Sequence, residues 1–118
     1  MLIWVAKERL TPDAREVIEE TADAVFVSAA TIWEIEIKRA LEKLTAPEDT
    51  VKLVDGSGFK RLDISFAHAR EAGRLPLLHG DPFDRMLIAQ ARLEGMTLAT
   101  ADAKLKRYDV PVLDVAPG

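Results

Sequence analysis

Three acidic residues of this sequence, Glu34, Asp84 and Asp102, have side chains of the kind that binds hard divalent cations such as magnesium or manganese. Carboxylates that are brought close together raise one another's pKa, at a cost of about 1.4 kcal/mol per pKa unit. A fold that gathers them therefore needs a compensating cation, and water bound to such a cation can act as a nucleophile. The chemistry to look for is metal-assisted hydrolysis.

Each of these residues also has a purely structural interpretation. Asp84 stands at the third position of a predicted helix, where a negative charge opposes the helix dipole. Glu34 and Lys38 are four residues apart and could form an exposed ion pair worth a few tenths of a kcal/mol. Asp102 could be a turn residue. The sequence alone leaves both interpretations open.

Other polar and aromatic residues have simpler expectations. Asp81 precedes a proline and is predicted to be a helix N-cap that contributes about 1 kcal/mol. His68 and His79 are expected at the surface, because neither has a partner at metal-binding spacing. Trp4 and Trp33 are predicted to lie in the core or to pack between helices.

Several cationic residues stand near the acids in the sequence. Arg85 or Lys38 could steady a phosphate group, and each could equally neutralise a neighbouring carboxylate. The cluster Lys104, Lys106 and Arg107 is typical of a solvated face, although it could also meet a phosphate backbone.

The elements that must position the acids alternate between strand and helix. The apolar segment AVFVSA (residues 24–29) predicts a buried strand, and the helical pattern of residues 31–44 follows it directly. Asp81 and Pro82 open a second helix that Gly95 closes, and MTLATA (residues 96–101) predicts the next strand. Such alternation favours a parallel sheet, whose ligands collect at the carboxyl ends of the strands.

The remaining elements complete one domain. Thr11 and Pro12 predict the start of a helix, and Ser65 is expected to cap another. We further expect a helix over LIWVA (2–6) and a short helix over 48–54. A strand is expected over FKRLDI (59–64). The segment VPVLDV (110–115) is expected to be an edge strand, because its proline has no N–H to donate to a neighbouring strand.

Composition limits the class of protein. The 118 residues, 48% of them apolar, are enough for a single core and one domain over residues 1–118. Cysteine is absent, which excludes disulfides and thiolate metal sites. No apolar run reaches the roughly 18 residues of a membrane span, so a cytoplasmic protein is expected. The net charge of −4 argues against gripping nucleic acid through bulk positive charge.

Three segments together carry a family pattern. VFVSAATIWEIEIK, HGDPFDRMLIAQA and TLATADAKLKRYDVPVL, in this order and spacing, resemble the PIN-domain nucleases, in particular the VapC-like toxins of toxin–antitoxin pairs. The resemblance extends from about Leu2 to Leu113. DPFDR before an apolar helix, joined to TxD after the next strand, is its most specific part. The resemblance implies a three-layer α/β/α sandwich with a parallel sheet.

The resemblance also implies an activity and a site. Family members hydrolyse RNA phosphodiester bonds with Mg2+ or Mn2+ held in an acidic pocket. Carried over to this sequence, the second, third and fourth acids fall on Glu34, Asp84 and Asp102, and the accompanying hydroxyl falls on Thr100. The implied partners are an RNA substrate, a cognate antitoxin that inserts a basic side chain among the acids, and a second copy of the chain.

One part of the family pattern has no counterpart here. Family members begin with a short central strand that ends in an aspartate, whereas the first acid of this chain is Glu8. We therefore expect this strand and its acid to be missing. Three explanations are open: the true start lies upstream, the chain is naturally truncated, or residues 2–6 replace the strand without supplying a carboxylate.

The missing acid keeps a second function open. A chain that lacks one metal ligand could be an inactive binding module that still pairs with an antitoxin-like partner. A receiver-like phospho-acceptor domain is a weaker third candidate, because the sequence has no adjacent acid pair early in the chain and no lysine in the expected place after a late strand.

Overall fold

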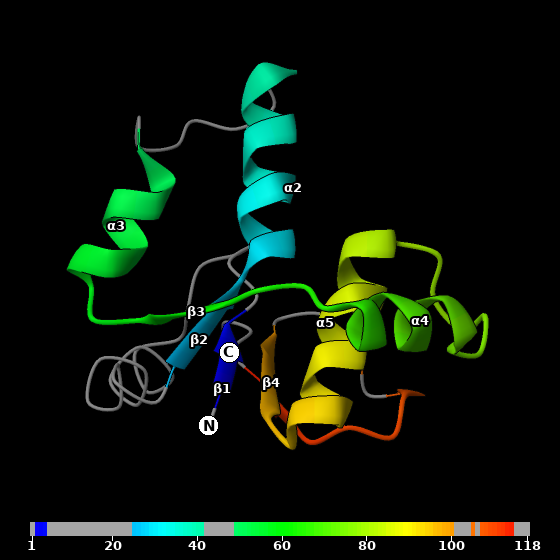
Figure 1. The fold of residues 1–118 in the computed structure, drawn as a ribbon. Coiled ribbons are helices and arrows are strands. Elements are labelled where there is room, and N and C mark those ends of the chain that lie inside the picture. The colour runs from blue at the N-terminus through cyan, green and yellow to red at the C-terminus, as the bar shows by residue number, and fades with distance from the viewer. Residues whose placement is uncertain (1, 5–24, 42–48, 101–104, 106, 115–118) are drawn as a thin grey trace.

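The fold centres on one parallel sheet. The computed structural model describes residues 2–4, 25–41, 49–100, 105 and 107–114 (Figure 1). The sheet has the strand order β3-β2-β1-β4-β5, and all neighbouring strands are parallel. The predicted α/β fold with a parallel sheet is confirmed. Its strands are β1 (Leu2–Trp4), β2 (Val25–Ser28), β3 (Lys60–Leu62), β4 (Thr97–Thr100) and β5 (Val112–Asp114).

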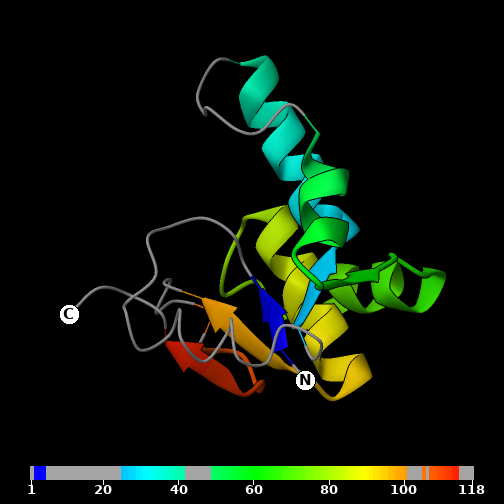
Figure 2. The same ribbon diagram turned by 90° about the vertical axis from the view of Figure 1, so that its left-hand side faces the viewer.

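The centre of the sheet corrects two expectations. Residues 2–4 form the central strand β1 rather than a helix, so the central position is not absent from the chain. Leu2 pairs with Val25 on one side and with Thr97 on the other. A strand here satisfies the backbone groups that β2 and β4 would otherwise leave unpaired in the middle of the sheet. Figure 2 shows β1 beside β4, with β5 outside them.

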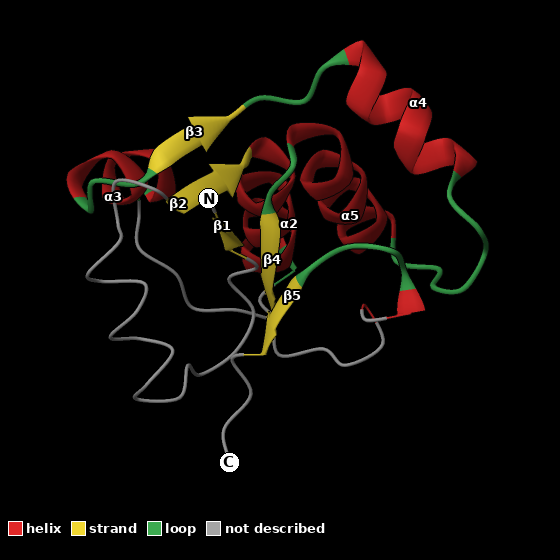
Figure 3. Cartoon of the chain, turned by 90° about the horizontal axis from the view of Figure 1, so that it is seen from below, coloured by secondary structure: helices red, strands yellow, loops and turns green. Residues whose placement is uncertain are grey.

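Helices pack on the sheet as the sequence pattern predicts. They are α2 (Ala29–Ala40), α3 (Thr50–Gly56), α4 (Phe66–Arg74) and α5 (Pro82–Glu94). Figure 3 shows α2 and α5 side by side along one face of the sheet, with α4 against α5. The helix expected from Thr11 and the residues Lys104 and Lys106 lie outside the described part. None of the described helices is long and apolar enough to cross a membrane.

The core is built around α5. Its residues Leu87, Ile88, Ala89 and Ala91 are almost fully buried, and they pack with Leu98 of β4. Gly95 ends the helix with a positive φ of 65°, which reverses the chain into β4. Because α5 thus runs antiparallel to β4, its N-terminus lies toward the carboxyl end of the sheet.

The outer side of α2 differs from its prediction. Trp33 was expected in the core or packed between helices; it is not in the core, since the residue is 61% exposed, but its ring does pack against Phe83 of the neighbouring helix α5. The residues of α2 that the fold buries are Ala30, Thr31 and Glu34. The buried face of α2 therefore carries small and polar residues. The apolar residues Trp33, Ala40 and Leu41, whose spacing predicted the helix, lie on its exposed side.

Candidate acidic site

The sheet topology fixes where a ligand should bind. The chain connects β1 to β2 on one side, and β4 to β5 on the other. In open parallel sheets a ligand site lies at the carboxyl ends of the strands where this direction reverses. Here that point lies between β1 and β4, next to Thr100, which is buried at the end of β4.

Asp81 and Asp84 begin α5 at this edge. One carboxylate oxygen of Asp81, Oδ1, accepts hydrogen bonds from the backbone N–H groups of Phe83 at 2.8 Å and of Asp84 at 3.3 Å. The predicted N-cap is therefore confirmed. Asp84 lies in the first turn with only 3% of its surface exposed. A carboxylate this deeply buried requires specific polar partners.

His79 is such a partner. Its Nε2 lies 2.8 Å from Oδ2 of Asp84. Since an ionised carboxylate can only accept, Nε2 carries the proton of this hydrogen bond. The ligand atoms of His79, Asp81 and Asp84 all lie within 4.8 Å of one another, which is close enough for a shared metal ion.

The histidine expectations need correction. His68 is buried: its Nδ1 accepts from the backbone N–H of Ser65 at 3.0 Å, and its Nε2 lies 2.8 Å from Glu94. His79 is partly buried and belongs to the acidic cluster. The place of His79 beside the acids was not predicted from the sequence, because its nearest acid, Asp81, is only two residues away and this separation is not a typical metal-binding spacing. The run HGDPFD, directly before a helix, was the available signal.

Glu34 comes from the neighbouring helix. Ser28 at the end of β2 caps α2 by accepting from the N–H of Ala30 at 3.0 Å, which places Glu34 in the second turn. Glu34 is 6% exposed, and its Oε2 lies 3.2 Å from Nζ of Lys38. The predicted Glu34–Lys38 ion pair is therefore present, and it involves a buried acid.

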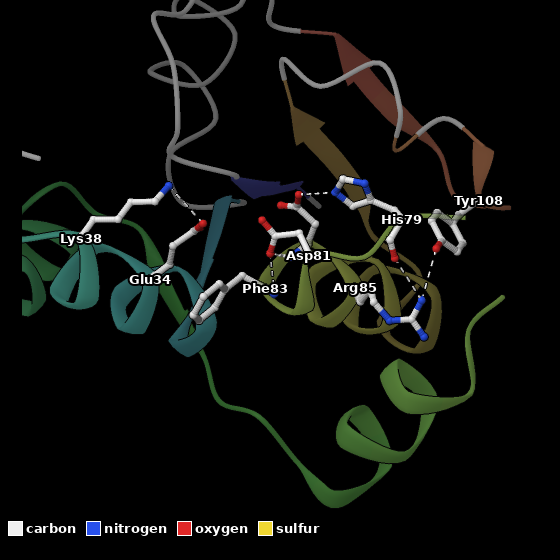
Figure 4. A network of polar contacts seen from close by, with 8 residues as sticks. Glu34, Lys38, His79, Asp81, Phe83, Arg85 and Tyr108 are labelled. Carbon is white, nitrogen blue, oxygen red and sulfur yellow. Dashed lines mark hydrogen bonds and ion pairs between the residues drawn. The ribbon is translucent and has the colours of Figure 1, made fainter. Parts of the chain in front are cut away.

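An aromatic contact holds the two helices together beside the acids. The rings of Trp33 and Phe83 meet edge to face with their centroids 5.1 Å apart. Each aromatic residue directly precedes one of the buried acids, Glu34 or Asp84. Figure 4 shows the Glu34 side chain on α2 and the Asp81 side chain at the start of α5.

The structure thus describes three of the four predicted site residues. Glu34, Asp84 and Thr100 are all buried at the carboxyl side of the sheet. Asp102 lies outside the described residues, two positions beyond the end of β4. The expectation that Arg85 steadies a phosphate is wrong, because its guanidinium is buried on backbone carbonyls.

The donor set suits a hard cation. The predicted ligands are carboxylates, which favour magnesium or manganese, and a partly buried imidazole stands beside them. Lys38 compensates the charge of Glu34, and the imidazole of His79 satisfies one oxygen of Asp84. The buried acids Glu34 and Asp84 therefore each have a polar partner, and among the described residues the ligand atoms of His79, Asp81 and Asp84 are close enough to share an ion.

Comparison with protein families gives one match over nearly the whole chain. The sequence pattern described as "PIN domain" matches residues 1–111. No curated protein sequence is significantly similar to this chain.

Solved structures share the fold at low sequence identity. A chain of DNA-bound VapBC from Salmonella typhimurium has a TM-score of 0.68 at 19% identity, with 96% of each chain covered. A chain of FitAB bound to a DNA fragment has a TM-score of 0.62 at 20% identity, covering 97% of this chain and 94% of that one. A chain of Rickettsia felis VapBC2, bound to a promoter fragment, has a TM-score of 0.62 at 16% identity, covering 98% and 99%.

Proposed function

Because this chain belongs to the PIN domain family, we propose that it is a metal-dependent endoribonuclease and the toxin of a toxin–antitoxin pair. PIN domains are generally nucleases, and the solved chains of similar fold come from VapBC and FitAB complexes. The observation that carries the proposal is the burial of Glu34 and Asp84 on neighbouring helices at the carboxyl edge of the sheet.

The proposed metal ligands are Glu34, Asp84 and Asp102, for Mg2+ or Mn2+. When bound, such an ion supplies a Lewis acid that lowers the pKa of water and stabilises charge on phosphate oxygens. The carboxylate of Asp84 is oriented by the hydrogen bond between its Oδ2 and Nε2 of His79. The hydroxyl of Thr100 is assigned to positioning the attacking water.

Among the described residues, Lys38 places a positive charge next to a buried acid of the proposed site. Its side chain is 42% exposed while its ammonium group contacts Glu34 at the edge of the site. An RNA phosphate that enters can therefore meet a positive charge before it meets the acids. This contact offsets part of the repulsion between phosphate and carboxylates in a chain of net charge −4.

The proposed partner is an antitoxin that covers the same edge. Two apolar cavities of about 280 and 270 Å³ lie beside α2, and Trp33 lines both. Trp33 is therefore an exposed ridge between two hollows, a shape that apolar side chains of a partner segment can straddle. The buried acids nearby favour a basic side chain from the same segment. A second copy of the chain is the further proposed partner.

Cleavage of RNA tests the proposal. Purified protein with Mn2+ should cleave a structured RNA, and Glu34→Gln, Asp84→Asn and Asp102→Asn should each lower the rate more than about 100-fold, since even the residues behind metal ligands contribute 10- to 100-fold. Asp49→Asn is the matched control, because Asp49 caps α3 away from these acids and asparagine caps a helix equally well.

The outcomes separate the candidate functions. Loss of cleavage in the three site variants, with unchanged circular dichroism, supports the assignment. Cleavage by Asp84→Asn at the parent rate would refute the role of this carboxylate. A parent protein that binds its partner without cleaving RNA or binding Mn2+ would indicate an inactive binding module instead.

A further inference from the structure

The guanidinium of Arg85 is buried under the acidic site and holds together the end of one helix and the loop that follows it. Arg85 is 9% exposed. Its Nη2 donates to the carbonyls of Ala72 and Leu75, both at 2.9 Å. Its Nη1 donates to the carbonyl of Pro76 at 3.0 Å and to that of His79 at 3.3 Å, and it lies 3.4 Å from the hydroxyl of Tyr108.

These partners are neutral, and their arrangement explains how a cation is accommodated there. Ala72 and Leu75 lie at the C-terminal end of α4, where carbonyl groups have no partner within the helix and the helix dipole is negative. Two hydrogen bonds from Arg85 thus satisfy backbone carbonyl groups at the C-terminal end of α4. The remaining donors extend to the loop between α4 and α5.

The loop is held at His79 from both sides. The backbone carbonyl of His79 accepts from Arg85, while its imidazole donates to Asp84. Two consecutive residues of α5 therefore bind the main chain and the side chain of one loop residue. Figure 4 shows Arg85 below the loop, with broken lines to the His79 carbonyl and to Tyr108. A movement of this loop would therefore displace the imidazole of His79 from Asp84.

We propose that Arg85 is a positioning residue that acts through His79: its guanidinium fixes the loop so that the imidazole holds Asp84 in the orientation needed to bind a metal ion. This inference rests on the proposed role of Asp84 as a ligand. It assigns a function to the arginine of DPFDR that is distinct from phosphate binding.

The number of donors explains why arginine is needed. The planar guanidinium carries five N–H donors and reaches four carbonyls in different directions. A lysine keeps the charge but has three donors on one nitrogen, so it can satisfy the end of α4 or the loop, not both. Arg85→Lys is therefore the informative change, and Tyr108→Phe is a milder one, because the tyrosine hydroxyl donates to Pro76 at 2.7 Å.

The first experiment measures His79 without metal. In the parent protein, nitrogen NMR of the imidazole should show the proton fixed on Nε2, as the bond to Asp84 requires. Arg85→Lys should shift this signal toward the average of the two tautomers, and Tyr108→Phe should do so less. An unchanged His79 signal in a folded Arg85→Lys protein would overturn the proposal.

The second experiment measures Mn2+ affinity by calorimetry in a double-mutant cycle. His79→Ala should weaken Mn2+ binding about 10- to 100-fold, the range found for residues behind metal ligands. Arg85→Lys should weaken it about 10-fold in the parent and have no further effect in the His79→Ala background. Independent effects that multiply in the double variant would show that Arg85 does not act through His79.

A control separates positioning from general stability. Met96→Ala removes a buried side chain beyond the opposite end of α5, so it should lower the urea midpoint without changing Mn2+ affinity. If Met96→Ala weakens Mn2+ binding as much as Arg85→Lys does, the effect of Arg85 is only structural. If the parent binds no Mn2+, the proposed function fails, while the NMR result still decides whether Arg85 fixes His79.

Discussion

The two sides of the acidic edge are built differently. On the inner face of α5, the apolar residues Leu87, Ile88, Ala89 and Ala91 are almost fully buried. The polar residues Arg85, His79 and Asp84 beside them are joined by hydrogen bonds. Around α2 and α3, large apolar side chains remain exposed, and Trp33 stands between two hollows; the others are Leu41, Val51 and Leu53. The inner face of α5 is thus packed by the fold itself, whereas α2 and α3 leave apolar side chains exposed beside the acids.

This difference separates two requirements of the proposed function. Metal ligands must be held within a fraction of an ångström, which the bonded network on α5 provides for Asp84. Recognition of a partner requires exposed apolar surface, which α2 and α3 provide. Glu34 lies where the two regions meet, since it is buried on a helix whose outer side is exposed.

The largest expected effect is a loss of folding stability when the buried face of α5 is changed. Ile88 is fully buried, so Ile88→Ala should lower the free energy of unfolding by about 2–5 kcal/mol, from lost burial and a residual cavity. Leu41→Ala on the exposed side of α2 should change it by less than about 0.5 kcal/mol. Urea unfolding followed by circular dichroism measures both, and equal losses would contradict the contrast between the two regions.

The next prediction concerns the exposed ridge. Trp33→Ala should cost the fold no more than about 1.5 kcal/mol, the upper range of an edge-to-face contact such as that with Phe83. It should weaken binding of the antitoxin by about 2 kcal/mol or more, as expected for a central aromatic anchor. Calorimetry with the purified partner measures this. Leu93→Ala, an exposed change on α5, is the control, and equal affinities of both variants would place the partner elsewhere.

A smaller effect is expected at the end of α5. Gly95 has a φ of 65°, and a Cβ added there would contact nothing within 4 Å. Gly95→Ala should therefore cost only the left-handed conformation itself, about 1 kcal/mol, measured by thermal unfolding. RNA cleavage should stay at the parent rate, because the acids lie at the other end of the helix. A much larger loss of stability would contradict this.

The smallest effect concerns the surface between α3 and β3. Hydrogen bonding to Arg61 holds the pKa of Asp55 below its ordinary value of 3.8, and Nε of Arg61 lies 2.9 Å from the carboxylate. The pair therefore stabilises the fold above the ordinary pKa, and this contribution is lost as the pH falls through the lowered pKa.

Comparing the parent with Asp55→Asn over a range of pH tests this pair. The difference in unfolding free energy should be constant at neutral pH and should shrink below pH 3.8. Added salt should also reduce it, since both groups are exposed. A difference that grows on acidification would contradict the sign of the pKa shift.

Local signals predicted most of the described fold. Ser65 and Asp81 cap helices, Gly95 ends one, and the strand that follows Pro111 lies at the edge of the sheet. Each of these features depends on chemistry within a few residues. A helix was expected at residues 2–6, and a strand there was only one of three open explanations, since a short apolar run fits a helix and a strand equally well. Its place between β2 and β4 is decided by distant pairing.

The positions of the candidate acids in the fold were predictable, whereas the side-chain contacts around them were not. The positions of Glu34 and Asp84 follow from strand ends and helix starts, which are visible in the sequence. The roles of His79 and Arg85 depend on how one loop folds against α4 and α5, and no spacing encodes that arrangement. The high exposure of Trp33 was not predictable, because apolar spacing does not reveal which face of a helix meets the sheet.

The central claim is that carboxylates from separate elements hold one divalent cation, and Mn2+ binding tests it without any substrate. Calorimetric titration of the parent and of Asp84→Asn is the measurement. The parent should bind Mn2+, and the variant should bind it at least about 100-fold more weakly while its circular dichroism spectrum stays unchanged. Equal Mn2+ affinity of the two proteins would contradict the account.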